Sequence, residues 1–258
     1  MKNCSYCNES GTLTKEHIWP SNIIKKYEMK LALYNKKIDK LVYSDPVIKD
    51  VCAKCNNELL SPLDLYLSEI YDSYLYQSLK PGDSTSIEFD FEMLSRALLK
   101  ISYNSCRALA NDDIIKAHDK FKDYILKGGY LSGFHLRLIV VTSAKIIAGG
   151  ELLDQMFPVT QLRCADIAYD GDLSHRFIVR LIAINSFWFY LIISKKTEKR
   201  DKWKRFISGF SSWKIQPGIQ IKPTMRKLDI PVSQTTYMSP ELMGTLFDAL
   251  NQFGGRNT

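Results

Sequence analysis

The chain has 258 residues, of which 45% are hydrophobic and 24% charged, a balance that is typical of folded globular proteins and excludes a largely disordered chain. The net charge is +7, and for a polyanionic partner the uneven placement of this charge matters more than the total. The longest apolar stretch, Phe187 to Ile193, is too short to span a bilayer, and no charged segment followed by an apolar core opens the sequence. We therefore expect a cytoplasmic protein that is not bound to a membrane.

Two CxxC pairs lie in the first quarter of the chain. They are Cys4/Cys7 and Cys52/Cys55, and four thiolates in two such pairs can surround one zinc ion tetrahedrally. A zinc ion with four thiolate ligands has no open position for water, so the spacing predicts a structural zinc. The other cysteines, Cys106 and Cys164, stand alone and are expected in the core.

The N-terminal segment is predicted to form a zinc-stabilised module. We expect a first cysteine knuckle, a strand that leads into Glu16 and His17, a long middle section, and a second knuckle that opens a helix. Helix-forming residues continue to Leu79, and Pro81-Gly82 ends them. We therefore predict a module over residues 1–80 and a second domain over residues 81–258.

The second domain is expected to begin with two helices. Apolar residues recur at helical spacing over residues 91–110, and the same helix carries Arg96, Lys100 and Arg107, which either face DNA or form a solvated side. Asn111 is a suitable N-cap for a following helix that the pair Gly128-Gly129 ends.

Short apolar runs then predict an antiparallel sheet. They are rich in Val, Ile, Leu and aromatic residues, and Asn185-Ser186 between the last two has the composition of a tight hairpin turn. The runs cover residues 135–142, 161–169, 176–184 and 187–194. A last helix is expected from Ser239-Pro240 to the Gly254-Gly255 pair. The fold class is therefore α+β with an antiparallel sheet.

Positive charge is concentrated in residues 195–227. This segment holds eleven Lys or Arg against Glu198 and Asp201, and the aromatic residues Trp203, Phe206, Phe210 and Trp213 are interleaved with them. Such a pattern suits a groove that neutralises phosphates while stacking bases; the alternative is a solvated basic face over core aromatics. We expect nucleic-acid contacts from Lys199, Arg200, Lys202, Lys204 and Arg205.

An acidic residue directly followed by histidine lies between the knuckles. A carboxylate that holds a divalent cation, beside an imidazole that takes a proton from water, is the minimum equipment for metal-assisted phosphodiester hydrolysis. Because the predicted zinc site is closed, a second ion is needed, and Glu16 and Asn56 can supply its ligands. The alternative for His17 is a histidine without a catalytic role. For His118 and His135 we expect structural roles, and His175 is left open.

The segments CSYC, TKEHIWP and CAKCNN together resemble the HNH, or ββα-metal, endonuclease family in its four-cysteine zinc form, over roughly residues 1–65. The resemblance implies that His17 is the general base, that Glu16 and Asn56 hold a catalytic Mg²⁺ or Mn²⁺, and that DNA is a better candidate substrate than RNA. Asn57 is the weaker candidate for the helical ligand. The chain departs from the family in having Glu16 where aspartate is common and Leu59 where many members carry lysine.

Two other functions remain open beside a metal-dependent endonuclease of bacterial defence or of a mobile element. The first is a non-catalytic zinc-ribbon module that binds nucleic acid or protein. The second is a nuclease subunit that a protein partner activates by engaging the C-terminal domain. A cleavage assay on His17→Ala separates catalysis from binding alone.

Overall fold

The computed structural model describes residues 2–27, 32–35, 40–43, 46–142, 144–148, 151–157, 161–167, 171–212 and 218–231. Two expectations concern residues outside these ranges. They are the C-terminal helix that begins at Ser239 and any stacking by the indole of Trp213.

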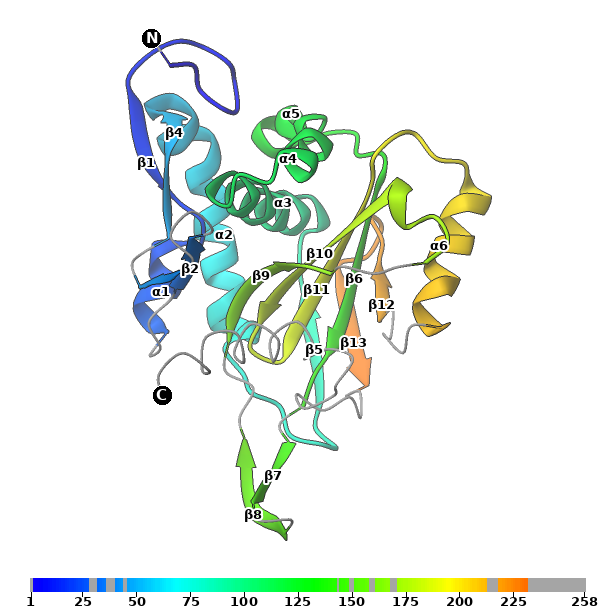
Figure 1. The fold of residues 1–258 in the computed structure, drawn as a ribbon. Coiled ribbons are helices and arrows are strands. Elements are labelled where there is room, and N and C mark those ends of the chain that lie inside the picture. Colours follow the sequence, from blue (N-terminus) through cyan, green and yellow to red (C-terminus); the bar gives the residue numbers. More distant parts are fainter. Residues whose placement is uncertain are drawn as a thin grey trace.

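The N-terminal unit is built on two antiparallel strands (Figure 1). Strand β1 (Leu13–His17) pairs with β4 (Val47–Cys52), so that Leu13 faces Cys52 and His17 faces Val47. Helix α1 (Ser21–Lys26) and the β2 (Ala32–Asn35) and β3 (Lys40–Tyr43) hairpin lie between them in sequence. After β4 the chain turns directly into a helical run, which confirms the predicted order of knuckle, strand, middle section, knuckle and helix.

That helical run is longer than one regular helix. It consists of a π-helical turn, η1 (Cys55–Leu60), then α2 (Ser61–Ile70), then a second π-helical turn, η2 (Tyr71–Leu75). Pro62 lies at the junction of η1 and α2, where it cannot donate a backbone hydrogen bond to the preceding turn. The run ends before Pro81-Gly82, where the domain boundary was expected.

The long central helix α3 (Phe91–Ala108) confirms the prediction for residues 91–110. Asp90 caps it, because its carboxylate accepts a hydrogen bond of 2.9 Å from the Met93 N–H. The single helix expected after Asn111 is two short ones, α4 (Asp112–Asp119) and α5 (Lys122–Lys127), with a break at Lys120 and Phe121. Gly128, at φ +75°, ends α5 as expected.

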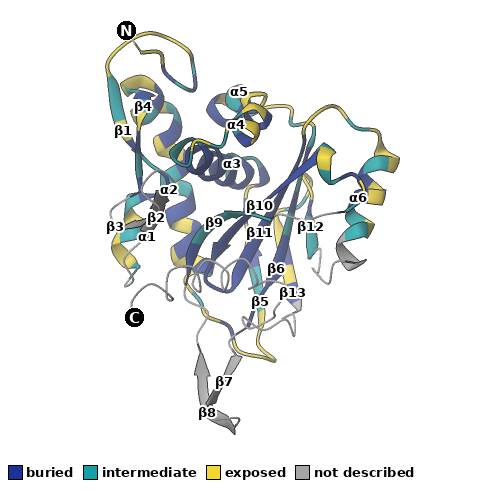
Figure 2. Cartoon of the chain, viewed as in Figure 1, coloured by how far each residue is buried: buried dark blue, intermediate teal, exposed yellow. Residues whose placement is uncertain are grey.

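A five-stranded sheet with the order β12-β6-β11-β10-β9 forms the centre of the C-terminal part. All four of its pairings are antiparallel, and Asn185, at φ +48°, makes the two-residue turn between β10 and β11. The strands are β6 (Phe134–Val140), β9 (Leu162–Asp166), β10 (Phe177–Ile184), β11 (Phe187–Ser194) and β12 (Ile219–Ile221). Every residue of β10 and β11 is buried (Figure 2), which shows that both faces of the sheet are covered.

The two faces of the sheet pack against different helices. Helix α3 packs against one face, and its cluster of buried apolar residues extends from Cys4 in the N-terminal unit to Ile230, across the expected domain boundary. On the other face, Trp203 and Phe206 of α6 (Arg200–Ser212) join a second cluster with Phe177 and Trp188. In Figure 1, α6 and the β1 and β4 pair accordingly lie on opposite sides of the sheet.

Several elements were not predicted from the sequence. They are α6, the pair β5 (Ser84–Glu88) and β13 (Lys227–Pro231), and the hairpin of β7 (Ala144–Ala148) and β8 (Glu151–Phe157). No helix in the described part of the chain is long and apolar enough to cross a membrane.

Candidate metal centre and candidate active site

The four cysteines of the two knuckles meet at one end of the N-terminal unit. One Sγ atom from each of Cys4, Cys7, Cys52 and Cys55 lies within 4.8 Å of the other three. Zinc–thiolate bonds of about 2.3 Å in a tetrahedron place sulfur atoms about 3.8 Å apart, and the Sγ atoms of Cys7 and Cys52 are 3.8 Å apart. The donor set and its spacing therefore fit a structural zinc ion.

Backbone hydrogen bonds prepare the first knuckle for the thiolate form. Burial raises the pKa of the Cys4 thiol, but N–H groups of Cys52, Cys7 and Tyr6 point at its sulfur and lower the pKa to about 7 overall. The Cys52 N–H is 3.3 Å from Cys4 Sγ, so the second knuckle contributes directly to the first. Burial raises the pKa of Cys55, which indicates that a cation is needed for its thiolate to form.

Glu16, the expected metal-binding acid, lies in the interior and is paired with a lysine. Its side chain is 2% exposed, and its Oε1 is 2.5 Å from the Nζ of Lys100, which is also 2.5 Å from Asp64 Oδ1. Burial raises the pKa of Glu16, and the Lys100 ammonium opposes that shift. Lys100, on α3, thus bridges β1 and α2, and Glu16 Oε1 also accepts a hydrogen bond from Asn104.

Further polar residues of α3 fasten it to the N-terminal unit. Asn104 donates to Glu16 Oε1 at 3.3 Å and to the His17 carbonyl at 3.2 Å, and its own Oδ1 accepts from the Tyr6 hydroxyl at 2.7 Å. Arg107 forms an ion pair of 2.9 Å with Asp50. These bonds hold the end of β1 and the first knuckle in place against α3.

The expectation for the basic residues of α3 is wrong in both of its forms. Lys100 and Arg107 face neither DNA nor solvent, because their side chains are 1% and 6% exposed and are paired with acids of the N-terminal unit. Arg96 donates to the carbonyls of Ile125 and Leu126, at the C-terminal end of α5. The polar stripe on this helix is an internal interface, which amphipathicity alone cannot distinguish from a solvated face.

His17 lies on β1, and Asn56 is hydrogen-bonded to the same strand. His17 ends β1 and is partly exposed, and the alternation of a strand directs it to the face opposite Glu16. The Asn56 amide nitrogen donates to Thr14 Oγ1 at 2.9 Å and to the Lys15 carbonyl at 2.8 Å. The first turn of the helix is therefore fixed to β1 one residue before Glu16, and the Asn56 Oδ1 takes no part in these two bonds.

The predicted nucleic-acid residues of α6 do not share one face. Arg205 is paired with Asp172, whereas Arg200 and Lys204 are one helical turn apart and line a common cavity. Trp203 and Phe206 are 8% and 2% exposed in the second core cluster, so the interpretation of these two aromatics as a base-stacking surface is wrong. The alternative, a basic face over core aromatics, describes them correctly.

The remaining histidines and single cysteines have identifiable surroundings. His118 is buried, with its Nδ1 2.8 Å from the Ile114 carbonyl and its Nε2 2.8 Å from Ser102 Oγ, which confirms a structural role. His175 is exposed after the αL residue Leu173. Cys106 is buried as expected, and the half-buried Cys164 accepts a hydrogen bond from Arg180.

Sequence reasoning missed the partners of Glu16. Asp64, Lys100 and Asn104 lie 48, 84 and 88 residues from it, respectively, so no local pattern connects them. The signal that was present is the spacing of polar residues at 96, 100, 104 and 107 within an otherwise apolar helix, which indicates a polar stripe that needs partners.

Among the described residues, the four thiols are the one group of three or more His, Cys, Asp or Glu side chains that converges as metal ligands. Comparisons of the chain with models of known families, with curated proteins and with solved structures give no match.

Proposed function

We propose that the protein is a metal-dependent endonuclease of the HNH type that hydrolyses phosphodiester bonds of DNA. The observation that carries the proposal is the course of the chain around the thiols. An antiparallel strand pair leads directly into a helix, β1 ends in Glu16 and His17, and Asn56 of the helix is hydrogen-bonded to β1 beside them. This arrangement agrees with the resemblance of the same residues to HNH enzymes.

In the proposed mechanism His17 is the general base. Its partial exposure at the end of β1 gives a water molecule access to the imidazole, which accepts the proton as that water attacks the phosphorus. The His17 carbonyl accepts a hydrogen bond from Asn104, which fixes the backbone that carries the ring. The four thiols would hold a zinc ion that links the two knuckles; with its four coordination positions filled by thiolates, such an ion would take no part in the chemistry.

A second, divalent ion such as Mg²⁺ or Mn²⁺ would supply charge stabilisation when it is bound. Glu16 and Asn56 are the residues proposed to hold it, through oxygen atoms of the kind that such hard ions prefer. The two hydrogen bonds that Asn56 donates to β1 come from its amide nitrogen, so its Oδ1 is outside them. Lys100 already balances part of the Glu16 charge, so we expect the ion to bind more weakly than at a carboxylate without such a partner.

The test is a cleavage assay on supercoiled DNA and on RNA with Mg²⁺, Mn²⁺ or EDTA. His17→Ala is compared with wild type and with His175→Ala, an exposed histidine that lies outside the N-terminal unit. Removing a general base lowers the rate by roughly 100-fold or more, whereas the His175 variant should cut like wild type. Equal cutting by His17→Ala and wild type would contradict the role of His17.

A second function, a zinc-stabilised module that binds without catalysis, is favoured by one observation. The Glu16 carboxylate is enclosed and paired with Lys100, whereas a metal-binding acid in an active site is usually open to the ion and its waters. If zinc-loaded wild type cuts neither DNA nor RNA with either ion, this function replaces the first. Cleavage that appears only when another protein is added would support the partner-activated form of the nuclease.

A further inference from the structure

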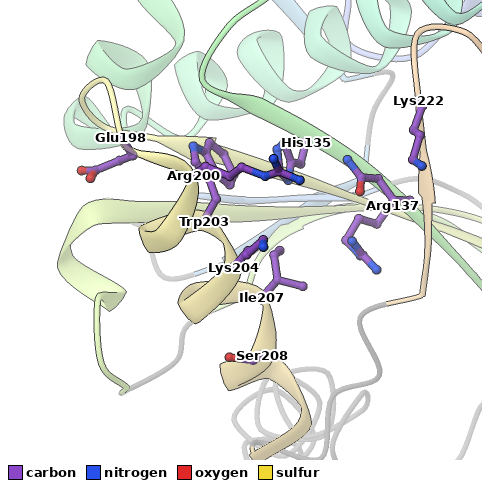
Figure 3. Close-up of a pocket in the computed structure, with 10 residues that line it drawn as sticks. His135, Arg137, Glu198, Arg200, Trp203, Lys204, Ile207, Ser208 and Lys222 are labelled. Atoms are coloured by element: carbon purple, nitrogen blue, oxygen red, sulfur yellow. The ribbon is translucent and has the colours of Figure 1, made fainter.

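A cavity lies on the face of the sheet that carries α6. Its volume is about 800 Å³, within the range of small-molecule sites, and β6, β12 and α6 form its walls (Figure 3). The lining side chains that carry the argument are His135 and Arg137 from β6, Lys222 directly after β12, Glu198 just before α6, and Arg200 and Lys204 of α6.

The cavity carries an excess of positive charge. Arg200, Lys204 and Lys222 are exposed, and none of the carboxylates in the described part of the chain forms an ion pair with them. The one acid in the lining, Glu198, is 3% exposed and is held by Arg176 at 2.8 Å. Its charge is therefore already balanced, and the three cations remain available to an anion.

The floor of the cavity adds two polar side chains in fixed positions. Arg137 donates to the Gly218 carbonyl at 2.7 Å, which orients its guanidinium, and burial lowers its pKa. The His135 ring stacks on Trp203 with centroids 4.0 Å apart, and no described residue hydrogen-bonds its Nδ1. Burial and, second, the charge of Arg137 lower the pKa of His135.

The cavity is separate from the proposed active site. Helix α6 and strand β12 lie on the opposite side of the sheet from the β1 and β4 pair that ends in His17 (Figure 1). A ligand of the cavity would therefore be bound on the other side of the sheet from His17.

We propose that this cavity binds a small molecule of nucleotide size that carries at least two phosphate groups. Arg200 and Lys204, one turn apart on α6, and Lys222 on the facing strand contact the phosphates, and Arg137 contacts them from below. A single-stranded nucleic acid fits less well, because such ligands stack their bases on exposed aromatics, and Trp203 in the lining is 8% exposed and already stacked on His135. This proposal does not depend on nuclease activity.

The test is calorimetric titration of the full-length, zinc-loaded protein with ATP, with inorganic pyrophosphate and with a single-stranded oligonucleotide. The variant is Arg200→Glu with Lys204→Glu, and the matched control is Lys199→Glu with Lys202→Glu. The control makes the same change in net charge on the same segment, at two positions outside the lining. All four side chains are at least partly exposed, so both variants should fold.

We expect saturable binding of ATP and pyrophosphate at one site per chain, weakened by roughly tenfold or more in the cavity variant and nearly unchanged in the control. Equal weakening in both variants would show general electrostatic attraction and overturn the proposal. Binding of the oligonucleotide but of neither small phosphate would overturn it in favour of a nucleic-acid surface, and no binding of any probe would also refute it.

Discussion

Lys100 is the residue that links three elements of the N-terminal half. Its ammonium lies 2.5 Å from carboxylate oxygens on β1 and α2 and is fully buried in α3. Removing one member of a buried ion pair leaves an uncompensated charge, which costs roughly 3–5 kcal/mol. We therefore expect Lys100→Met to lower the free energy of unfolding by about that amount, measured by urea denaturation.

A matched control and a rescue make this result specific. Lys127→Met removes an exposed pair with Asp123, whose two side chains are 70% and 89% exposed, and should cost less than about 1 kcal/mol. Adding Glu16→Gln to Lys100→Met should restore part of the loss, because one of the stranded charges is then gone. If Lys100→Met were as stable as wild type, the ion pair would not be what holds these elements together.

His118 predicts a pH dependence of stability. Burial of the enclosed ring lowers its pKa to about 3 from an ordinary value of 6.5; the hydrogen bond from its Nδ1–H to the Ile114 carbonyl opposes that shift, and the charges of Arg180 and Arg107 add to it. Below pH 6.5 the His118 imidazole therefore binds a proton in the unfolded chain, whereas in the folded chain it stays neutral down to about pH 3. The stability is fully present above the unfolded pKa and falls as the pH decreases through this window, by up to about 1.4 kcal/mol per pH unit.

The measurement is the slope of unfolding free energy against pH for wild type and His118→Gln. We expect the slope of the variant to be smaller by about 1 kcal/mol per pH unit within that window. Parallel slopes would mean that His118 is protonated to the same extent in the folded and unfolded chains.

At the scale of residues, the four thiols could be identified from the sequence, but the residues that contact Glu16 could not. The two CxxC pairs predict a four-thiol site from spacing alone, because two such pairs are typical of cysteines that converge on one metal ion, and the four thiols do converge. The pairing of Glu16 with Lys100 was not predictable, since it depends on how α3 packs against β1. The same packing explains why the prediction that the basic residues of α3 face DNA or solvent was wrong.

At the scale of elements, α6 decides whether the second face of the sheet is covered. Phe206 is 2% exposed, and its ring stacks on Phe177 with centroids 4.2 Å apart. Phe206→Ala leaves a cavity between helix and sheet, and we expect a loss of roughly 3–5 kcal/mol in urea denaturation. Ser208→Ala, an exposed position on the same helix, should change stability by less than about 0.5 kcal/mol. Similar losses in both variants would indicate that α6 does not depend on this packing.

The elements that were predicted differ from those that were missed in the sequence pattern that marks them. The β10 and β11 hairpin was predictable because two apolar runs flank Asn185-Ser186, a turn that tolerates a positive φ. Helix α6 was not predicted because charged residues dominate this segment. Its apolar side is marked mainly by Trp203 and Phe206, which are three residues apart and buried. The β5 and β13 pair joins segments about 140 residues apart, which no local pattern reveals.

At the scale of the whole molecule, the thiol cluster is expected to hold the N-terminal end of the shared core. Cys55→Ser should reduce the zinc content from about one ion per chain to nearly none, whereas Cys164→Ser, outside the cluster, should keep it. Losing a ligand that is present at a thousand times its Kd costs about 4 kcal/mol of stability. Zinc content is measured by atomic absorption and stability by thermal unfolding; a Cys55→Ser protein that retained its zinc would contradict the four-thiol assignment.

The arrangement of the whole molecule also separates the two proposed sites. The strand pair with the thiols lies on the α3 side of the sheet, and the cationic cavity lies on the α6 side (Figure 1). The α+β class with an antiparallel sheet and an N-terminal cysteine cluster followed from the sequence. The placement of the cavity did not, because His135, Arg200 and Lys222 meet only through the order of the strands and the path of α6.

The most direct test of the proposed nuclease is its dependence on a second metal ion at constant zinc content. The rate of nicking of supercoiled DNA is measured as Mn²⁺ or Mg²⁺ is added to protein that retains one zinc per chain, with EDTA-treated and zinc-restored protein as the reference. We predict no cutting with zinc alone, a cutting rate that rises and saturates with the added ion, and loss of cutting in His17→Ala. Cutting that is unaffected by the added ion, or absent at every concentration of it, would contradict the proposed nuclease.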